Sequence, residues 1–392
     1  MEDKKIEGVE STEVIEMKLP LVSIKIPSFN YGRYLGNCLD SVLNQTYPNI
    51  EVLFRDNNSE DDSFEIALSY RHKFEEKGFY YDVAKNKRNL GSDRNTARIS
   101  GFADGRFHFV LGCDDSISPT FIESCMELFL KYPELSTVIT HREEIDENNN
   151  KRLTPPFYNK NCVIEGKKQA AVYMMAGIAV PVQRMFDVRK LTRTVGAYYR
   201  QYLVAGDWAW NYLYSLVGDV AYIKEPLCQY RTHFGNETNE SELNLLGIME
   251  HFSLINEFYN AAKALKIDEV LERREIAIEK LGSMCMRYAV KMLYNNLHDV
   301  ANKYLLLAPV YKLGIEKEDI YKEIKDCLTM KGDKLNDRLQ AIENTYNVNR
   351  TVSYDPPEEH KEFELEGIKY YRDEEDDEKY LAMIERKVII KE

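Results

Sequence analysis

Two adjacent carboxylates, Asp114 and Asp115, are the residues of this sequence best suited to chemistry. They follow the apolar run FHFVLG at 107–112, which predicts a buried strand. Neighbouring carboxylates at the end of such a strand repel each other, and a divalent cation relieves that repulsion. Mg²⁺ and Mn²⁺ prefer carboxylate oxygens together with substrate phosphates. The pair therefore suggests a metal site, although Asp-Asp-Ser is also common in solvated turns before helices.

Other polar residues stand at the ends of predicted strands. The run LVSIKI ends in Pro27, Ser28, Phe29 and Asn30, and the run EVLF is followed closely by Asp56. In an open parallel sheet, ligands bind beyond the carboxyl ends of the strands, so these residues are candidates for a binding site. Asp56 taken alone also fits an Asx turn that closes a strand.

Two more residues have a chemical and a structural interpretation. Asp207 precedes the aromatic, helix-like run WAWNYLY. A carboxylate beside aromatic rings can have a raised pKa and act as a general base, or it can cap the helix. His233, in QYRTHFGNET, is either a metal or phosphate ligand or a structural histidine.

Strand-like and helix-like segments alternate three times in the first third of the chain. This order predicts an α/β domain with a mostly parallel sheet flanked by helices. From Leu245 onward, apolar residues repeat at helical spacing, which predicts a helical C-terminal extension. We expect four regions: a flexible lead over 1–19, the α/β domain over 20–240, the helical region over 241–345 and a charged tail or small appendage over 346–392.

The composition excludes several classes of protein. The chain has 392 residues, of which 44% are hydrophobic, and a net charge of −13, which disfavours generic binding of nucleic acid. Its seven cysteines are scattered without a C-x-x-C pair, which favours reduced thiols. The N-terminus lacks the apolar segment of a signal peptide, and no apolar run is long enough to span a membrane. We therefore expect a cytoplasmic chain, either free or peripheral at a membrane.

Two common phosphate-binding motifs are absent from the sequence. Neither G-x-G-x-x-G nor G-x-x-x-x-G-K-[ST] occurs, which disfavours dinucleotide-binding and P-loop sites. A carboxylate-rich site without phosphate-binding glycines would instead hold a diphosphate through a divalent cation.

The order and spacing of several motifs resemble the family 2 glycosyltransferases, which have the GT-A fold. The segment IPSFNYGRYLGNCLDSVLNQTYPNIEVLFRDNNSEDDS is similar to their opening P-x-[YF]-N, helix and D-[DN]-x-S-x-D elements. NLGSDRN and ADGRFHFVLGCDD resemble two later elements, and GDW and YRTH more weakly resemble the catalytic-aspartate and Y-R-x-H elements. The resemblance covers about residues 20–240, as a nucleotide-binding half over 20–120 and an acceptor half over 121–240.

The resemblance implies a role for each matched residue. Phe29 would pack against the nucleotide base, and Asp56 would accept a hydrogen bond from it. Asp114 and Asp115 would bind Mn²⁺ or Mg²⁺ and the sugar diphosphate, and Asp207 would be the general base. Pro27, Ser28 and Asn30 would shape the nucleotide pocket, and Gly91 and Arg94 would lie near the nucleotide. His233 would assist at the metal or the diphosphate.

Two positions depart from the family pattern. Gly112 stands where many relatives have the first Asp of D-x-D-D, so a ribose or metal contact made by that side chain is absent. Gly206 replaces the usual Glu before Asp207, which weakens the assignment of the base. The last two carboxylates of D-x-D-D are retained.

These features predict an inverting, metal-dependent glycosyltransferase. It would move a sugar from a nucleoside-diphosphate sugar, UDP-linked by preference or dTDP-linked, to a hydroxyl of a glycan, lipid-linked or protein acceptor by single displacement. Two other hypotheses stay open. One is a nucleotidyltransferase, although the segment PSFNYGRYLG lacks the glycine-rich basic loop that is usual in those enzymes. The other is a weakly active or inactive binding partner in glycan assembly. The helical region could contribute to the acceptor site, form a homodimer or contact a partner.

Overall fold

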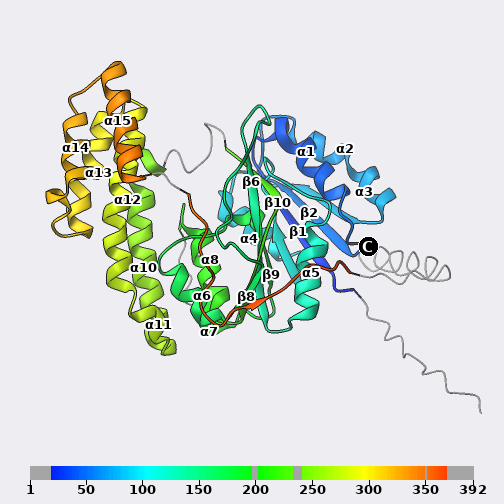
Figure 1. Ribbon diagram of the computed structural model, residues 1–392. Helices are drawn as coiled ribbons and strands as arrows, with labels where there is room; N and C mark the ends of the chain where they lie inside the picture. The colour runs from blue at the N-terminus through cyan, green and yellow to red at the C-terminus, as the bar shows by residue number, and fades with distance from the viewer. Residues whose placement is uncertain (1–18, 197–201, 233–240, 349–350, 369–392) are drawn as a thin grey trace, which may run out of the picture.

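The computed structural model describes residues 19–196, 202–232, 241–348 and 351–368 (Figure 1). The strands are β1 (Val22–Ser28), β2 (Ile50–Asp56), β3 (Tyr80–Lys85), β4 (Phe107–Val110), β5 (Ser116–Ile117), β6 (Leu135–Ile145), β7 (Lys151–Leu153), β8 (Cys162–Ile164), β9 (Arg184–Asp187), β10 (Asp219–Arg231) and β11 (Lys361–Glu362).

The helices fall into two groups along the chain. Those among the strands are α1 (Gly32–Leu43), α2 (Ser63–Ser69), α3 (Arg71–Lys77), α4 (Ser92–Ser100), α5 (Phe121–Lys131), α6 (Gly166–Tyr173), α7 (Arg193–Gly196) and α8 (Gly206–Ser215). The C-terminal ones are α10 (Leu246–Leu265), α11 (Asp268–Leu271), α12 (Arg274–Tyr294), α13 (His298–Tyr311), α14 (Asp319–Cys327) and α15 (Gly332–Tyr346). Short 3₁₀ helices cover Pro181–Gln183 and Ile315–Lys317.

All of these strands belong to one sheet. Its order is β11-β8-β10-β6-β9-β4-β1-β2-β3, with β5 beside β10 and β7 beside β6. The neighbours β4, β1, β2 and β3 are parallel, which confirms the predicted α/β arrangement. β9 lies antiparallel between β4 and β6, and so it joins this half of the sheet to a second half built on the parallel pair β6 and β10.

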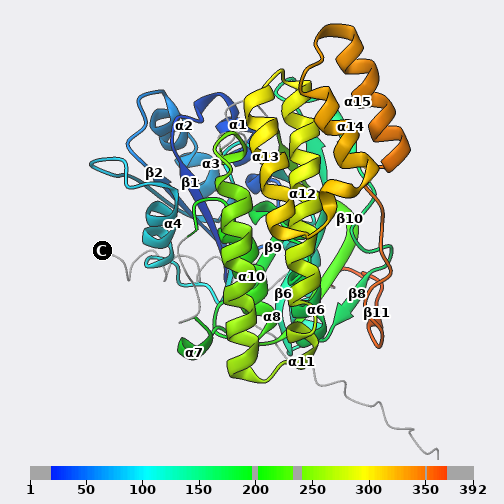
Figure 2. The same ribbon diagram turned by 90° about the vertical axis from the view of Figure 1, so that its left-hand side faces the viewer.

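Helices cover both faces of the sheet. Figure 1 shows α1, α2, α3 and α5 on one face, with α6 and α8 on the other. The C-terminal helices form a bundle beyond α6 and α8, in which α10, α12 and α13 stand side by side (Figure 2). The predicted helical C-terminal region is therefore present.

The sequence pattern explains why the central elements form. β1 and β2 are buried along almost their whole length, as expected of internal strands of a parallel sheet. α1 buries Leu35, Leu39 and Val42, which lie on one face because their spacing matches the helical repeat.

The bundle shares an apolar core with the second half of the sheet. This core runs from β8 and β10 through α6 and α8 into α10, α12 and α13, and a separate core lies under α1 and α5. Tyr212 of α8 stacks on Phe258 of α10 with ring centroids 3.8 Å apart. The bundle is thus packed directly onto the helix that carries Asp207.

The described part of the C-terminal tail returns to the sheet. β11 pairs antiparallel with β8, and Phe363 beside it is buried. The rings of Tyr354 and Phe157 lie 5.2 Å apart between centroids. Within 351–368, residues Lys361–Glu362 therefore form the edge strand of the sheet, which the high charge of this segment does not suggest.

Glu51 holds the start of β4 against β1 and β2. Its buried Oε1 accepts hydrogen bonds from Ser23 Oγ at 2.6 Å and from the backbone N–H groups of Asp104 and Gly105 at 2.7 and 2.9 Å. A Cβ atom at Gly105 would lie 2.8 Å from the carbonyl oxygen of Leu21, so this close approach requires glycine.

We expect Gly105→Ala to lower the free energy of unfolding by about 1–3 kcal/mol, because the backbone at the start of β1 must shift to admit the methyl group. Denaturant titration measures the change. The matched control is Gly101→Ala at the C-cap of α4, where φ is −72° and the nearest atom would be 3.4 Å away. This control should change stability by no more than about 0.5 kcal/mol. Equal effects of the two substitutions would contradict the prediction.

Candidate active site

The register of the parallel strands brings the predicted residues to one edge of the sheet. Ser28 is the partner of Asp56 across β1 and β2, and the N–H of Asn57 donates to the Ser28 carbonyl at 2.7 Å. The thiol of Cys113 donates to the carbonyl of Pro27 at 3.3 Å, so the loop that follows β4 packs against the end of β1.

The end of β1 is tied to the turn after β2. Asn30, with a φ of 59°, donates its N–H to Ser59 Oγ at 2.9 Å, and its Oδ1 accepts the N–H of Glu60 at 2.9 Å. Phe29 lies between these anchored residues and still has 39% of its surface exposed. An apolar ring exposed at a ligand-binding edge can stack on a planar ligand.

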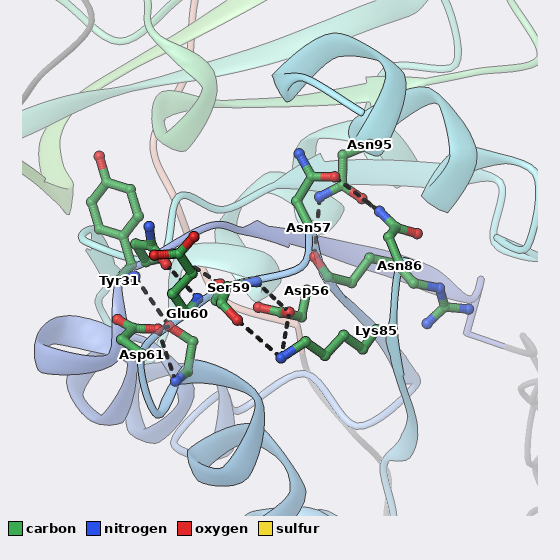
Figure 3. A network of polar contacts seen from close by, with 12 residues as sticks. Tyr31, Asp56, Asn57, Ser59, Glu60, Asp61, Lys85, Asn86 and Asn95 are labelled. Carbon is green, nitrogen blue, oxygen red and sulfur yellow. Dashed lines mark hydrogen bonds and ion pairs between the residues drawn. The ribbon is translucent and has the colours of Figure 1, made fainter. Parts of the chain in front are cut away.

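Asp56 has polar contacts on one of its two carboxylate oxygens (Figure 3). The residue is fully buried, and its Oδ2 accepts the N–H of Ser59 at 2.8 Å and lies 3.7 Å from Lys85 Nζ. Its Oδ1 is also buried and has no hydrogen-bond partner among the residues that the structure describes. A buried acceptor without a donor is costly, so this oxygen marks a place where a ligand N–H would bind.

A chain of asparagine amides fixes the loop between β3 and α4, as Figure 3 shows. Asn86 Nδ2 donates to Asn57 Oδ1 at 3.0 Å and to Asn95 Oδ1 at 2.8 Å. The loop ends at Gly91, the N-cap residue of α4, whose φ of 82° suits glycine. Arg94 is exposed in the first turn of α4. Both implied residues therefore lie on a loop and helix that the amides anchor beside Asp56.

Asp115 is held in place by Arg231. Its Oδ1 accepts the backbone N–H of Arg231 at 2.9 Å, and the Arg231 side chain donates to the carbonyl oxygens of Asp114 and Asp146 at 2.9 and 2.6 Å. Burial raises the pKa of Asp115 well above its usual range, and the charge of Asp114 adds to this. The N–H of Arg231 and the charges of Arg142 and Arg231 oppose the rise.

Gly112 provides the space into which both carboxylates point. A Cβ atom there would lie 2.9 Å from Asp114 Oδ1 and 3.0 Å from Asp115 Oδ2. A larger side chain would displace them, so the departure from D-x-D-D at this position leaves room for two converging oxygens. Two converging carboxylates suit a hard divalent cation that completes its shell with water and phosphate oxygens.

The described part of the chain contains no group of three or more His, Cys, Asp or Glu side chains that could hold a metal. Among the described residues, a cation at Asp114 and Asp115 would find no third ligand of these types. His233, the third implied metal ligand, lies outside the described residues.

Asp207 stands in the first turn of α8, where 40% of its side chain remains exposed. Arg184 of β9 lies 3.4 Å from its Oδ1 and donates to its backbone carbonyl at 2.9 Å and to Asn211 Oδ1 at 2.8 Å. Burial raises the pKa of Asp207, the positive charge of Arg184 lowers it, and the charge of Asp93 in α4 raises it slightly. The carboxylate is thus enclosed enough to be a stronger base than a surface aspartate and open enough to meet a substrate.

The sequence alone does not reveal the roles of three residues at the site. Arg231 belongs to the YRTH element, but only its contacts reveal that it anchors the Asp114–Asp115 loop. Arg184 and Lys85 sit in strands without a local motif, and their roles follow from the carboxylates that they reach. An arginine in a short apolar strand is a weak signal, because buried arginines are rare without a partner.

Comparisons with known proteins agree with this geometry. The family model described as glycosyl transferase family 2 matches residues 23–188, a range that ends before Asp207. The chain is 29% identical to the chondroitin synthase of Escherichia coli over 65% of its own length and 34% of that protein. It is 28% identical to the hyaluronan synthase of Pasteurella multocida over 62% of its length and 23% of that protein. It thus spans about a third or less of these relatives.

A crystal structure of S. aureus TarS residues 1–349 in complex with UDP shares the fold. Its TM-score is 0.50 at 14% identity, and the superposition covers 89% of this chain and 100% of that one. None of the helices among the described residues is long and apolar enough to cross a membrane. Together with the motifs at the sheet edge, the comparisons show that residues 23–188 are similar to the family 2 glycosyltransferases and that the chain has the GT-A fold.

Proposed function

We propose that the chain transfers a sugar from a nucleoside-diphosphate sugar to a hydroxyl acceptor by a single displacement with inversion. The observation that carries the proposal is the convergence of Asp114 and Asp115 over Gly112, at the same sheet edge as the unpaired oxygen of Asp56. These groups suit the two ends of a nucleoside diphosphate. Asp56 can accept a hydrogen bond from the base, and Asp114 and Asp115 can hold a cation beside the phosphates.

Asp56 favours a base that offers a ring N–H. Uracil and thymine each present one such donor between two carbonyl groups, whereas cytosine and adenine present an acceptor at the corresponding ring nitrogen. Phe29, which directly follows the strand that pairs with Asp56, offers an exposed face on which the base can stack. A UDP-sugar is our preferred donor and a dTDP-sugar the alternative, and the UDP complex of the TarS structure with the same fold supports the first.

Asp114 and Asp115 would hold Mn²⁺ or Mg²⁺ when the donor binds. The ion would stabilise the negative charge that develops on the departing diphosphate. In this chain, the N–H and side chain of Arg231 hold the loop that carries the two carboxylates after β4, and Gly112 has no side chain to displace their oxygens.

Asp207 would remove the proton from the acceptor hydroxyl as that oxygen attacks the anomeric carbon. Arg184 orients the carboxylate and partly offsets the rise of its pKa, while the exposed part of the Asp207 side chain admits the acceptor. The attack occurs on the side opposite the departing diphosphate, and no covalent intermediate is needed. The acceptor would be a glycan, lipid-linked or protein hydroxyl, and the glycan-polymerising relatives favour the first.

The first test is a panel of UDP-, dTDP- and GDP-sugars with Mn²⁺ or Mg²⁺. We expect nucleoside diphosphate release from one donor, and we expect a chelator or Asp115→Asn to reduce it at least 100-fold because the cation site is lost. UDP with Mn²⁺ should also raise the Tm of the wild type and not of Asp115→Asn. The control is Asp333→Asn, the same change at an exposed position of α15.

Two outcomes would contradict the proposal and support one of the other hypotheses. Stabilisation by UDP and Mn²⁺ without release from any donor, even with glycan acceptors added, would favour the binding-partner hypothesis. Release of pyrophosphate from a nucleoside triphosphate and a sugar phosphate would favour a nucleotidyltransferase.

Asp56→Asn tests the recognition of the base. The new amide oxygen would keep the hydrogen bond from Ser59, which leaves the NH₂ group to face the base. We expect UDP to bind about 10–100-fold more weakly and CDP to bind relatively better, because cytosine offers an acceptor there. Calorimetry of both nucleotides measures the ratio of their Kd values. An unchanged ratio would remove Asp56 from the base site.

The pH dependence of turnover tests Asp207 and Arg184. The base must be ionised, so turnover should rise with pH through the raised pKa of Asp207. Because the positive charge of Arg184 lowers that pKa, Arg184→Gln should move the acidic limb of the profile to higher pH.

Arg152→Gln, at an exposed arginine of β7, is the control and should leave the profile in place. Asp207→Asn should reduce turnover by about 10²–10⁴-fold. Its Tm at neutral pH should stay the same or rise, because the folded protein favours the uncharged form of this group. A profile that is identical in wild type and Arg184→Gln would exclude Asp207 as the titrating base.

A further inference from the structure

Glu250 of α10 reaches across to the segment that precedes α8. Its Oε1 accepts the backbone N–H of Leu203 at 2.7 Å, and its Oε2 accepts those of Val204 and Ala205 at 2.8 and 2.9 Å. One carboxylate from the helical region therefore binds three consecutive backbone amides of the α/β domain. Hydrogen bonds to an ionised acceptor are the stronger kind, and three on one group fix the direction of the chain.

The bound segment leads directly to Asp207. Ala205 is the N-cap residue of α8, and Asp207 is the second residue of the helix. The local sequence Leu-Val-Ala-Gly over 203–206 has no side chain that can accept a hydrogen bond, and α8 has no side-chain cap. The first turn of a helix leaves N–H groups unpaired, and a negative charge is favourable there. Glu250 accepts the N–H of this N-cap residue and those of the two residues before it, so it fixes the direction in which the chain enters α8.

Tyr202 and Ala205 on either side of the segment are buried in the apolar core, whereas its first residue is exposed. Leu203 is 68% exposed, so its side chain gains little from burial. Farther along α8, Tyr212 stacks on Phe258 and donates its hydroxyl to the Phe258 carbonyl at 2.8 Å, which fixes the middle of the helix against α10. The aromatic contacts therefore set the distance between the two helices, and Glu250 sets where α8 begins.

We propose that Glu250 is a positioning residue for the general base, so that the helical region is part of the catalytic unit. It acts through the 203–205 segment and has no contact with the donor in this proposal, which rests on the function proposed above for Asp207. Loss of the carboxylate would leave three amides without their acceptor and would let the first turn of α8 shift or fray. The base would then lie in the productive position for a smaller fraction of the time.

The experiment compares Glu250→Ala, Glu250→Gln and Glu269→Gln, the last being the same isosteric change at an exposed position of α11. We expect Glu250→Ala to lower kcat about 10–100-fold while the donor KM and the Kd of UDP change less than twofold. Glu250→Gln should lie between this variant and the wild type, because its single oxygen can serve one side of the segment only. Glu269→Gln should match the wild type.

Hydrogen exchange provides a readout that does not depend on turnover. The amides of residues 203–205 should exchange faster in both Glu250 variants, while those in the middle of α8 stay protected. If Glu250→Ala fails to fold, Glu250→Gln carries the same comparison. Unchanged exchange at 203–205, or faster exchange with unchanged kcat, would overturn the proposal.

The two proposals fail in different ways. If the wild type releases no nucleoside diphosphate from any donor, the function proposed for Asp207 fails and the role of Glu250 in positioning a base falls with it. If the wild type releases nucleoside diphosphate and the Glu250 variants turn over at the same rate, the function stands and the positioning role alone is wrong.

Discussion

Carboxylates that accept backbone N–H groups from distant parts of the chain hold this molecule together around its site. Glu51 binds the start of β4, Asp56 the turn after β2, Asp115 the end of β10, and Glu250 the segment before α8. A buried carboxylate is costly unless such donors surround it, so each one requires its partner segment to arrive in one position. The sheet edge is therefore set by polar contacts as well as by the apolar cores beneath it.

Several polar groups at this edge are placed to suit a ligand. Asp56 has one oxygen that no donor among the described residues reaches, and the oxygens of Asp114 and Asp115 converge on the space above Gly112. Asp207 is enclosed and yet exposed in part, with its pKa held between the effects of burial and of Arg184. In a stable fold such departures from full pairing concentrate at functional positions, because substrate completes them.

The helical region contacts the elements around the site through apolar packing and through the carboxylate of Glu250. Its apolar core continues that of α6 and α8, and Glu250 adds a polar contact at the start of α8. The family model ends at residue 188, before Asp207. The helices that pack against the part of the chain carrying the proposed base thus lie outside the matched range.

The sequence by itself determined the parallel half of the sheet and the residues at its carboxyl edge. Alternating strands and helices are local patterns, and the motifs that contain Phe29, Asp56 and Asp114 each lie within a few residues. The antiparallel β9 and the return of residues 351–368 to the sheet edge could not be inferred, because short or charged strands carry no periodic signal.

Only the tertiary structure decided the partners of the carboxylates at and around the site. Arg184 meets Asp207 across 23 residues of sequence, Arg231 meets Asp115 across 116, and Glu250 meets Val204 across 46. A hydrogen bond depends on the position of two groups after folding, and no spacing along the chain encodes it. The sequence therefore determined which chemistry is present, and the fold determined which side chains hold it in place.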